Sequence, residues 1–260
     1  MLRVENVQLS FGGVHALAGV SVYAETGKIT SVIGPNGAGK TSLFNVISGF
    51  YKPQAGIVTL DGEDISRMKP HARAYRGMSR TFQNIALFHG MTVLDNVKLG
   101  AHTNLKSGVL SAGLRLPVAR REELDLDVYI KRDILPVLGL EHVQNQYVED
   151  LSYGLQKRIE LARAMVMRPK ILLLDEPVAG MNREEKREMG QLIKELNRTL
   201  ETTVLLIEHD MGIVMSISDH VDVISFGKPV ASGAPADVQS NPDVIKVYLG
   251  GADEPTQHAA

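Results

Sequence analysis

The chain has 260 residues, a formal net charge of −2, no cysteine and 44% hydrophobic residues. This length suits one large domain or two small ones with an ordinary hydrophobic core, and the lack of cysteine excludes disulfides and thiolate metal sites. The near-neutral charge argues against a nucleic-acid-binding protein, since such domains are usually basic. The sequence has neither a signal-peptide pattern nor an apolar run of about 18 residues, so we expect any membrane attachment to come through a partner.

The N-terminal part reads as strands interrupted by one helix. Residues 2–11 and 20–23 have the patterns of strands, and residues 28–33 form a buried-type strand rich in β-branched side chains. A glycine-rich loop follows, then a helix over residues 41–48 and a strand over residues 57–61. Strand, glycine loop and helix in this order is the context that a phosphate-binding loop requires.

The central part, from residue 84 to residue 165, has mainly helical patterning. Residues 119–138 place apolar side chains at helical spacing on a charged background, and residues 156–167 read as another helix. Residues 105–118 are rich in Gly and Leu and indicate a helical hairpin or a loop. This part is therefore predicted to be an inserted helical subdomain.

The C-terminal part returns to alternating elements. The expected elements are strands at 171–174, 202–207, 223–226 and 229–232, a helix at 183–200, and a frayed end over 252–260. Strands that alternate with helices favour an α/β fold with a mainly parallel sheet.

Residues 34–41 read Gly-Pro-Asn-Gly-Ala-Gly-Lys-Thr and fit the pattern G-x-x-x-x-G-K-[ST]. The glycines allow backbone N–H groups to turn toward phosphate oxygens, and the following helix adds the positive end of its dipole. Lys40 is expected to bridge the β- and γ-phosphates, and the Thr41 hydroxyl to bind Mg²⁺.

Two adjacent carboxylates follow the apolar run at residues 171–174. Asp175 is expected at the carboxyl end of a buried strand, where ligands gather in open α/β sheets, and it would hold Mg²⁺ directly or through water. Glu176 is then placed to polarise the attacking water as a general base. The phosphate loop and this acidic pair together indicate hydrolysis of a nucleoside triphosphate.

With Leu151-Ser152-Tyr153-Gly154 the set of motifs resembles the ATP-binding-cassette (ABC) ATPases. Gly34–Thr41 is similar to their Walker A motif and Ile171–Glu176 to their Walker B motif. Leu151–Gly154 is similar to the signature. Phe11 matches the aromatic residue that stacks on adenine, Gln83 the Q-loop glutamine and His209 the switch histidine.

The resemblance gives each matched residue an expected role, with ATP and Mg²⁺ as cofactors. The residues expected to bind ATP are Phe11, Gly34, Pro35, Asn36, Gly37, Ala38, Gly39, Lys40, Thr41 and Ser42. Those expected at Mg²⁺ are Thr41, Gln83 and Asp175, and those expected in catalysis are Glu176 and His209. Leu151, Ser152, Tyr153 and Gly154 would act on the ATP bound by a second subunit, and Asn182 lies at the D-loop position.

The resemblance also implies an architecture, which is a single ABC ATPase domain over residues 1–251. It would contain a RecA-like P-loop NTPase core with an N-terminal antiparallel β-subdomain (about 1–83 and 166–235), an inserted α-helical subdomain (about 84–165) and a helical tail (236–251). Residues 252–260 would be a flexible C-terminus.

Two positions depart from the family pattern. Leu155 stands where the signature usually has Gln, a departure that bears on the strength of the closed ATP sandwich, and Asn182 stands where the D-loop usually has Asp. We expect activity, because the Ser and Gly that bind the anion remain.

A narrower resemblance is to the ATP-binding subunit of bacterial branched-chain amino acid importers. It rests on residues 81–97, the insertion near 105–125, the signature, Gly180-Met-Asn and the tail Asn241–Gly250. It implies a cytoplasmic-face, peripheral subunit of the inner membrane with a second ATPase subunit, two permease subunits and, indirectly, a periplasmic solute-binding protein. Phe88, Met91 and Val93 are candidates for lining the groove that contacts the permease.

Several points stay open at this stage. The resemblance favours an importer ATPase for branched-chain or related amino acids, with urea, an amide or an aromatic acid as the alternative solute. The second ATPase can be a copy or a homologue. Within transport, an exporter or a lipid-extraction ATPase has similar cassettes. The other classes are a soluble cassette ATPase acting on DNA or ribosomes, which nucleic-acid-stimulated activity would indicate, and a small-molecule kinase. The charge argues against the first, and the signature and His209 against the second.

Overall fold

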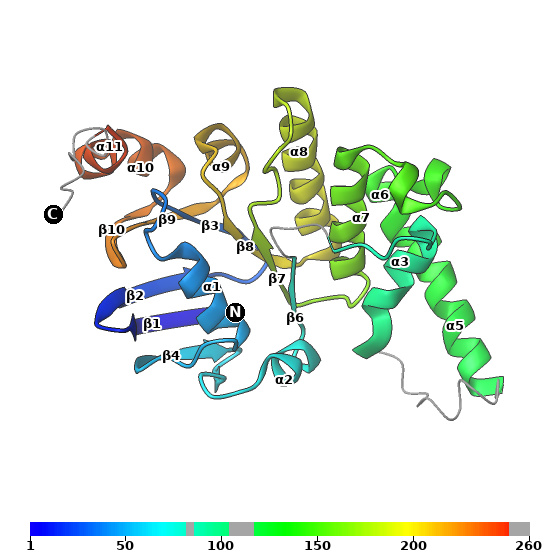
Figure 1. Ribbon diagram of the computed structural model, residues 1–260, viewed down its shortest axis with the longest axis horizontal. Helices are drawn as coiled ribbons and strands as arrows, with labels where there is room; N and C mark the ends of the chain where they lie inside the picture. The colour runs from blue at the N-terminus through cyan, green and yellow to red at the C-terminus, as the bar shows by residue number, and fades with distance from the viewer. Residues whose placement is uncertain (82–85, 104–116, 250–260) are drawn as a thin grey trace, which may run out of the picture. The chain divides into compact units, whose positions relative to one another are not determined.

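The computed structural model describes residues 1–81, 86–103 and 117–249. Gln83, most of the predicted hairpin at 105–118 and the predicted frayed end at 252–260 therefore lie outside the described residues. The chain divides into two compact units, which are Met1–Lys69 with Leu205–Ala260, and Pro70–Val204. Figure 1 labels the helices and strands of both units. Within the described ranges, no helix has the length and apolarity needed to cross a membrane.

The first unit contains a four-stranded antiparallel sheet with the strand order β2-β1-β4-β5. Its strands are β1 (Leu2–Phe11), β2 (Val14–Ala24), β4 (Ala55–Leu60) and β5 (Glu63–Asp64). Strand β2 begins earlier than the predicted 20–23, because its pairing with β1 continues through register shifts as far as Phe11 and Val14. Those shifts interrupt the alternation from which a strand is predicted.

The first unit also contains the strand and helix that flank the glycine loop. Strand β3 (Ile29–Ile33) is buried at every position and pairs in parallel with β9 (His220–Ser225), while β10 (Lys228–Gly233) runs antiparallel to β9. The helices are α1 (Lys40–Ser48), α9 (Met211–Ile217), α10 (Pro235–Ser240) and α11 (Pro242–Leu249). A strand with only buried positions is typical of a parallel sheet covered on both faces.

The C-terminal helices pack on the core that supports the glycine loop. Val238 of α10 and Val244 of α11 share one buried cluster with Ile33, the last residue of β3, and with Val221 and Val223 of β9. The tail thus stabilises the strand from which the loop departs.

Strand β9 contains a buried carboxylate. Asp222, on the face of β9 opposite Val221 and Val223, is 5% exposed, and its Oδ1 lies 3.4 Å from His220 Nε2. Its Oδ2 has no hydrogen-bond partner among the described residues. Burial raises the pKa of Asp222, and Ser232 and His220 oppose this rise only in part.

We therefore expect Asp222→Asn to stabilise the protein at neutral pH by about 1 kcal/mol, the scale of a buried polar group without a partner. A carboxyl whose pKa is higher in the folded state than in the unfolded state stabilises the fold only while protonated. Its contribution is lost as pH rises through the folded-state pKa. The difference between variant and wild type should thus shrink as the pH falls toward about 4, the ordinary carboxyl pKa. Thermal unfolding at several pH values measures it, and a variant less stable than wild type at neutral pH would contradict it.

The second unit contains β6 (Met78–Arg80), which pairs in parallel with β7 (Ile171–Asp175), together with α2 (Pro70–Tyr75) and α8 (Arg183–Leu200). Strand β7 is buried at every position, as the apolar run predicts. Strand β8 (Thr203–Ile207) contains the point at which the chain passes from this unit to the first. The short elements α2 and β6 were not predicted from the sequence.

The remaining elements of the second unit are helical. They are α3 (Val93–Leu99), η1 (Gly100–Thr103), α5 (Pro117–Tyr129), η2 (Ile130–Ile134), α6 (Leu135–Leu138), η3 (Glu141–Val143), η4 (Val148–Asp150) and α7 (Tyr153–Met165). The helix predicted at 119–138 is helical throughout, but η2 is a π-helical turn just before Pro136.

Two expectations about the second unit are wrong. Helix α7 begins at Tyr153 rather than near Gln156, so Tyr153 and Gly154 form its first turn instead of preceding it. Val93 is 0% exposed and belongs to the core, so it is not free to line a surface groove. Phe88 is 56% exposed and Met91 is half-buried, and both keep their place as groove candidates.

Candidate functional site

The glycine loop is tightly fitted to its surroundings in the first unit. A Cβ on Gly34 would lie 2.0 Å from the Ile224 carbonyl oxygen, and one on Gly39 would lie 2.4 Å from the Ala16 carbonyl oxygen. Both residues also have positive φ angles, 156° and 102°. Close backbone approach and left-handed backbone together require glycine at these two positions.

Lys40 folds back under the loop. Its Nζ donates hydrogen bonds to the carbonyl oxygens of Gly34 at 2.7 Å and Pro35 at 3.0 Å, and the residue is 7% exposed. The loop is thereby closed into a ring around a buried ammonium group. Asn36 and Gly37, at the opposite side of the ring, are exposed.

Helix α1 begins directly after the loop without a side-chain cap. Gly39 is its N-cap, no side chain caps it, and its first turn contains no acidic residue. Uncapped N–H groups and the positive end of the helix dipole favour an anion at this point. Thr41, in the first turn, is exposed.

Phe11 is an exposed aromatic residue rather than part of the core. It is 47% exposed and meets Tyr51 edge to face, with 5.2 Å between the ring centroids. Tyr51 was not predicted from the sequence, and the fold brings it to Phe11 from the segment after α1. An exposed aromatic ring such as Phe11 can stack on a planar ring such as adenine.

Asp175 ends β7 with a carboxylate that is almost enclosed. It is 5% exposed, and its Oδ2 accepts a hydrogen bond from Nη2 of Arg80 at 2.8 Å. Glu176 follows with a φ of 48°, a left-handed conformation that is uncommon for a residue with a side chain. Arg80 was not predicted from the sequence, since it has no motif of its own.

His209 is held through its backbone by a buried carboxylate. Glu208 is 0% exposed, and its Oε2 accepts hydrogen bonds from the backbone N–H of His209 at 2.9 Å and of Asp210 at 3.2 Å. Asp210 in turn caps α9 by accepting from the N–H of Ile213. The His209 side chain follows β8, is 53% exposed, and has its Nδ1 3.7 Å from Glu208 Oε2.

The signature residues form the N-terminus of α7. Ser152 occupies the N-cap position, but its side chain makes no capping hydrogen bond, so a purely capping role does not describe it. The Tyr153 hydroxyl donates to the Ala179 carbonyl at 3.2 Å, and its ring lies next to Gly180. The signature therefore contacts the segment that leads to the D-loop position.

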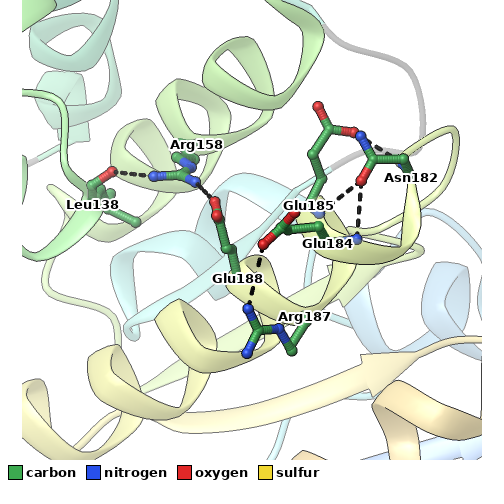
Figure 2. Close-up of polar contacts among 7 residues, drawn as sticks. All are labelled: Leu138, Arg158, Asn182, Glu184, Glu185, Arg187 and Glu188. Atoms are coloured by element: carbon green, nitrogen blue, oxygen red, sulfur yellow. Dashed lines mark hydrogen bonds and ion pairs between the residues drawn. The ribbon is translucent and has the colours of Figure 1, made fainter.

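Asn182 starts α8 with a capping box. Its Oδ1 accepts from the N–H groups of Glu184 at 2.9 Å and Glu185 at 3.0 Å, and Glu185 Oε2 accepts from the Asn182 N–H at 2.9 Å (Figure 2). An Asp would make the same cap, so the cap does not explain the departure from the family pattern.

A cavity of about 220 Å³ lies between the starts of α7 and α8. Ser152 and Leu155 line it from the signature, and Glu185 and Glu188 line it from α8. Arg158 joins the two helices by donating to Glu188 Oε2 at 2.5 Å, and it also reaches the Leu138 carbonyl at 3.5 Å (Figure 2). Leu155, at the position where the family has Gln, thus lines a cavity that also contains charged side chains.

The predicted site residues are shared between the two units. Phe11, the loop Gly34–Ser42 and His209 belong to the first unit, and Asp175, Glu176, the signature and Asn182 to the second. Gln83 lies outside the described residues. Each unit therefore contains several of the residues that are expected to form the site.

Comparison with known proteins gives the family. The model described as ABC transporter matches residues 17–179. The chain belongs to the ABC transporter family. A second ABC transporter model, described as branched-chain amino acid ATP-binding cassette transporter, matches residues 228–254.

The relatives of this ABC transporter chain cover almost its whole length. It is 44% identical over 252 residues to the high-affinity branched-chain amino acid transport ATP-binding protein BraF of Pseudomonas aeruginosa, covering 97% of this chain and 98% of the relative. It is 43% identical over 256 residues to the corresponding protein LivG of Escherichia coli, with the same coverage.

A solved structure supports the same fold. The ADP conformation of an ATP-binding cassette of an ABC transporter superposes with a TM-score of 0.83 and 34% identity, covering 96% of this chain and 98% of the other. The predicted fold class, a P-loop NTPase with an antiparallel β-subdomain and a helical insertion, is confirmed. The chain is an ATP-binding and ATP-hydrolysing component of an ABC transporter.

Proposed function

We propose that the chain is the ATPase subunit of an importer for branched-chain amino acids. The observation that carries this proposal is the high identity to BraF and LivG along 97% of the chain, together with the match of residues 228–254 to the model for branched-chain amino acid cassettes. Those residues include β10 and α10, and α10 packs on the core under the phosphate loop. The part of the chain that supports the loop is thus also the part that matches the importer model.

In this proposal the first unit binds the nucleotide. Phe11 stacks on adenine, and the backbone N–H groups of the loop with Lys40 and the start of α1 bind the phosphates. Two ATP molecules lie between two ATPase subunits, and Ser152 and Gly154 of one subunit act on the γ-phosphate bound by the other. The uncapped state of Ser152 supports this role, because its hydroxyl makes no bond to its own helix end.

Mg²⁺ is proposed at Thr41, Gln83 and Asp175. Mg²⁺ prefers oxygen ligands and takes only one or two carboxylates when nucleotide phosphates complete its shell. The described residues contain no group of three or more His, Cys, Asp or Glu placed to hold a metal by themselves. Asp175 provides one buried carboxylate, which fits an Mg²⁺ ion that binds together with its nucleotide.

Hydrolysis is assigned to Glu176 and His209. Glu176 takes the proton of the attacking water, and His209 contacts the γ-phosphate and steadies Glu176 and the water. Bound Mg²⁺ would neutralise charge that develops on the phosphates. ATP binding closes the pair of ATPase subunits, and hydrolysis with product release reopens it.

The partners in this proposal are a second ATPase subunit, two membrane permease subunits and, indirectly, a periplasmic solute-binding protein, with no nucleic acid. The subunit lies peripherally on the cytoplasmic face of the bacterial inner membrane. Phe88 and Met91 belong to the proposed permease groove, since both remain accessible on the segment before α3.

The test is uptake of labelled leucine by cells in which the gene is deleted. We expect the wild-type gene to restore uptake and a Glu176→Gln gene, expressed to the same level, to fail. Uptake of an unrelated sugar controls for general loss of energy. Leucine uptake that never depends on the gene would contradict the proposed solute, and the same cells would then be tested with urea, amides and aromatic acids.

A further inference from the structure

The strongest unassigned feature is a buried ion pair at the Walker B carboxylate. Nη2 of Arg80 lies 2.8 Å from Oδ2 of Asp175, and the two side chains are 9% and 7% exposed. Among the described residues, Arg80 is the partner of this carboxylate, and no second cation contacts it. Both residues belong to the second unit.

The backbone holds this pair in a fixed position. Arg80 ends β6 and Asp175 ends β7, and the two strands pair in parallel with Arg80 opposite Leu173. The pairing continues past Arg80, because the Thr81 N–H donates to the Leu173 carbonyl at 3.0 Å, and the Asp175 N–H reaches Thr81 Oγ1 at 3.5 Å. The Arg80 guanidinium thus belongs to a residue of the neighbouring strand β6 rather than to a loop residue.

This geometry restricts the carboxylate. The terminal torsion of an Asp side chain is broad, so an unpaired carboxylate samples many orientations. A charge-assisted hydrogen bond to one oxygen selects an orientation and leaves the other oxygen in a defined direction.

We propose that Arg80 is a positioning residue for the Mg²⁺ site: it holds the Asp175 carboxylate in the orientation in which its other oxygen serves the Mg²⁺ that binds with the nucleotide. This inference rests on the proposed function, in which Asp175 is a Mg²⁺ ligand. The opposing explanation is that the pair only holds β6 against β7. In that case its loss would lower stability without changing the response to Mg²⁺.

The experiment separates these two explanations by measuring binding rather than turnover. The full chain is mixed with a fluorescent, non-hydrolysable ATP analogue, and Mg²⁺ is added stepwise. The Mg²⁺ concentration that gives half of the increase in analogue binding is then compared between variants. We expect Arg80→Met to raise this concentration about tenfold, the usual effect of losing a partner of a metal ligand. Binding of the analogue in EDTA should stay within about twofold of wild type, since the proposed role of Arg80 acts through the Mg²⁺ ligand Asp175.

Lys98→Met is the matched control. Lys98 Nζ pairs with Asp127 Oδ1 at 2.5 Å, and the side chains are 25% and 23% exposed, so this substitution also breaks a partly buried ion pair of the second unit. It should lower the unfolding midpoint without moving the Mg²⁺ response. A shift of similar size in Lys98→Met and Arg80→Met would overturn the positioning role.

Arg80→Gln keeps a polar group at the position and decides the question if Arg80→Met does not fold. The Mg²⁺ concentration for half of the increase in binding should rise in Arg80→Gln as well, because Gln also lacks the charge. An unchanged Mg²⁺ midpoint in the folded Arg80 variants overturns the inference and leaves the proposed function standing. A wild-type chain whose nucleotide binding does not respond to Mg²⁺ overturns both the inference and the proposed Mg²⁺ site, and the uptake experiment remains the separate test of transport.

Discussion

Glu176→Gln is expected to lower steady-state ATP hydrolysis by about 100-fold or more while ATP binding is retained. A positioned general base contributes about 10²- to 10⁴-fold to such a reaction, and an amide cannot accept the proton of the attacking water. The substitution is nearly isosteric, and Glu176 is not a residue of the phosphate loop. Its left-handed backbone, with φ of 48°, does not depend on the carboxylate charge. Glu176→Gln should therefore bind ATP as wild type does but hydrolyse it much more slowly.

Two measurements test this expectation on the same sample. Phosphate release at saturating ATP reports hydrolysis, and equilibrium binding of ATP reports affinity. Size-exclusion chromatography with ATP should also show a trapped dimer, since reopening requires hydrolysis in the proposed cycle. Glu195→Gln, the same chemical change at an exposed position of α8, is the control and should behave as wild type. Hydrolysis by Glu176→Gln within a few fold of wild type would show that another group takes the proton.

The elements predicted best were those whose signal is local. Helix α8 runs over Arg183–Leu200 as predicted, because the capping box of Asn182 and Glu185 fixes its start in the sequence itself. Strands β3 and β7 were found because every position is buried, so the apolar run alone identifies them. The phosphate loop was found because its motif is contiguous in the sequence, although the carbonyl oxygens that require Gly34 and Gly39 belong to the distant residues Ile224 and Ala16.

The features that were missed depend on contacts between distant segments. Strand β6 has three residues ending in Arg80 and no alternation, and it is a strand only because β7 pairs with it. No motif predicts Arg80, Tyr51 or Glu208, because their roles come from contacts with Asp175, Phe11 and the backbone of His209. The early start of α7 was missed because glycine at its second position reads as a helix breaker.

Lys40→Ala is expected to weaken ATP binding by about 100-fold, or about 3 kcal/mol, the scale for truncating one partner of a desolvated, charged hydrogen-bonded pair. In the structure the ammonium group is 7% exposed and donates to the carbonyl oxygens of Gly34 and Pro35. It is therefore already held at the loop before nucleotide arrives. Bound phosphates would offer it charged acceptors in place of neutral ones, and charge-assisted hydrogen bonds are about twice as strong.

The same contacts allow a different explanation, in which Lys40 only holds the loop in shape. The two explanations predict different behaviour of Lys40→Arg, which keeps the charge but has a planar, bulkier head. If shape dominates, Lys40→Arg should unfold the loop and lower the thermal midpoint as much as Lys40→Ala does. If charge on phosphate dominates, Lys40→Arg should retain more affinity than Lys40→Ala at equal stability. Calorimetric titration with ATP measures this, with Lys246→Ala, whose side chain is 78% exposed, as the control. If Lys40→Ala binds ATP with unchanged affinity, Lys40 does not bind the phosphates. The phosphate site would then consist of the backbone N–H groups of the loop and the start of α1.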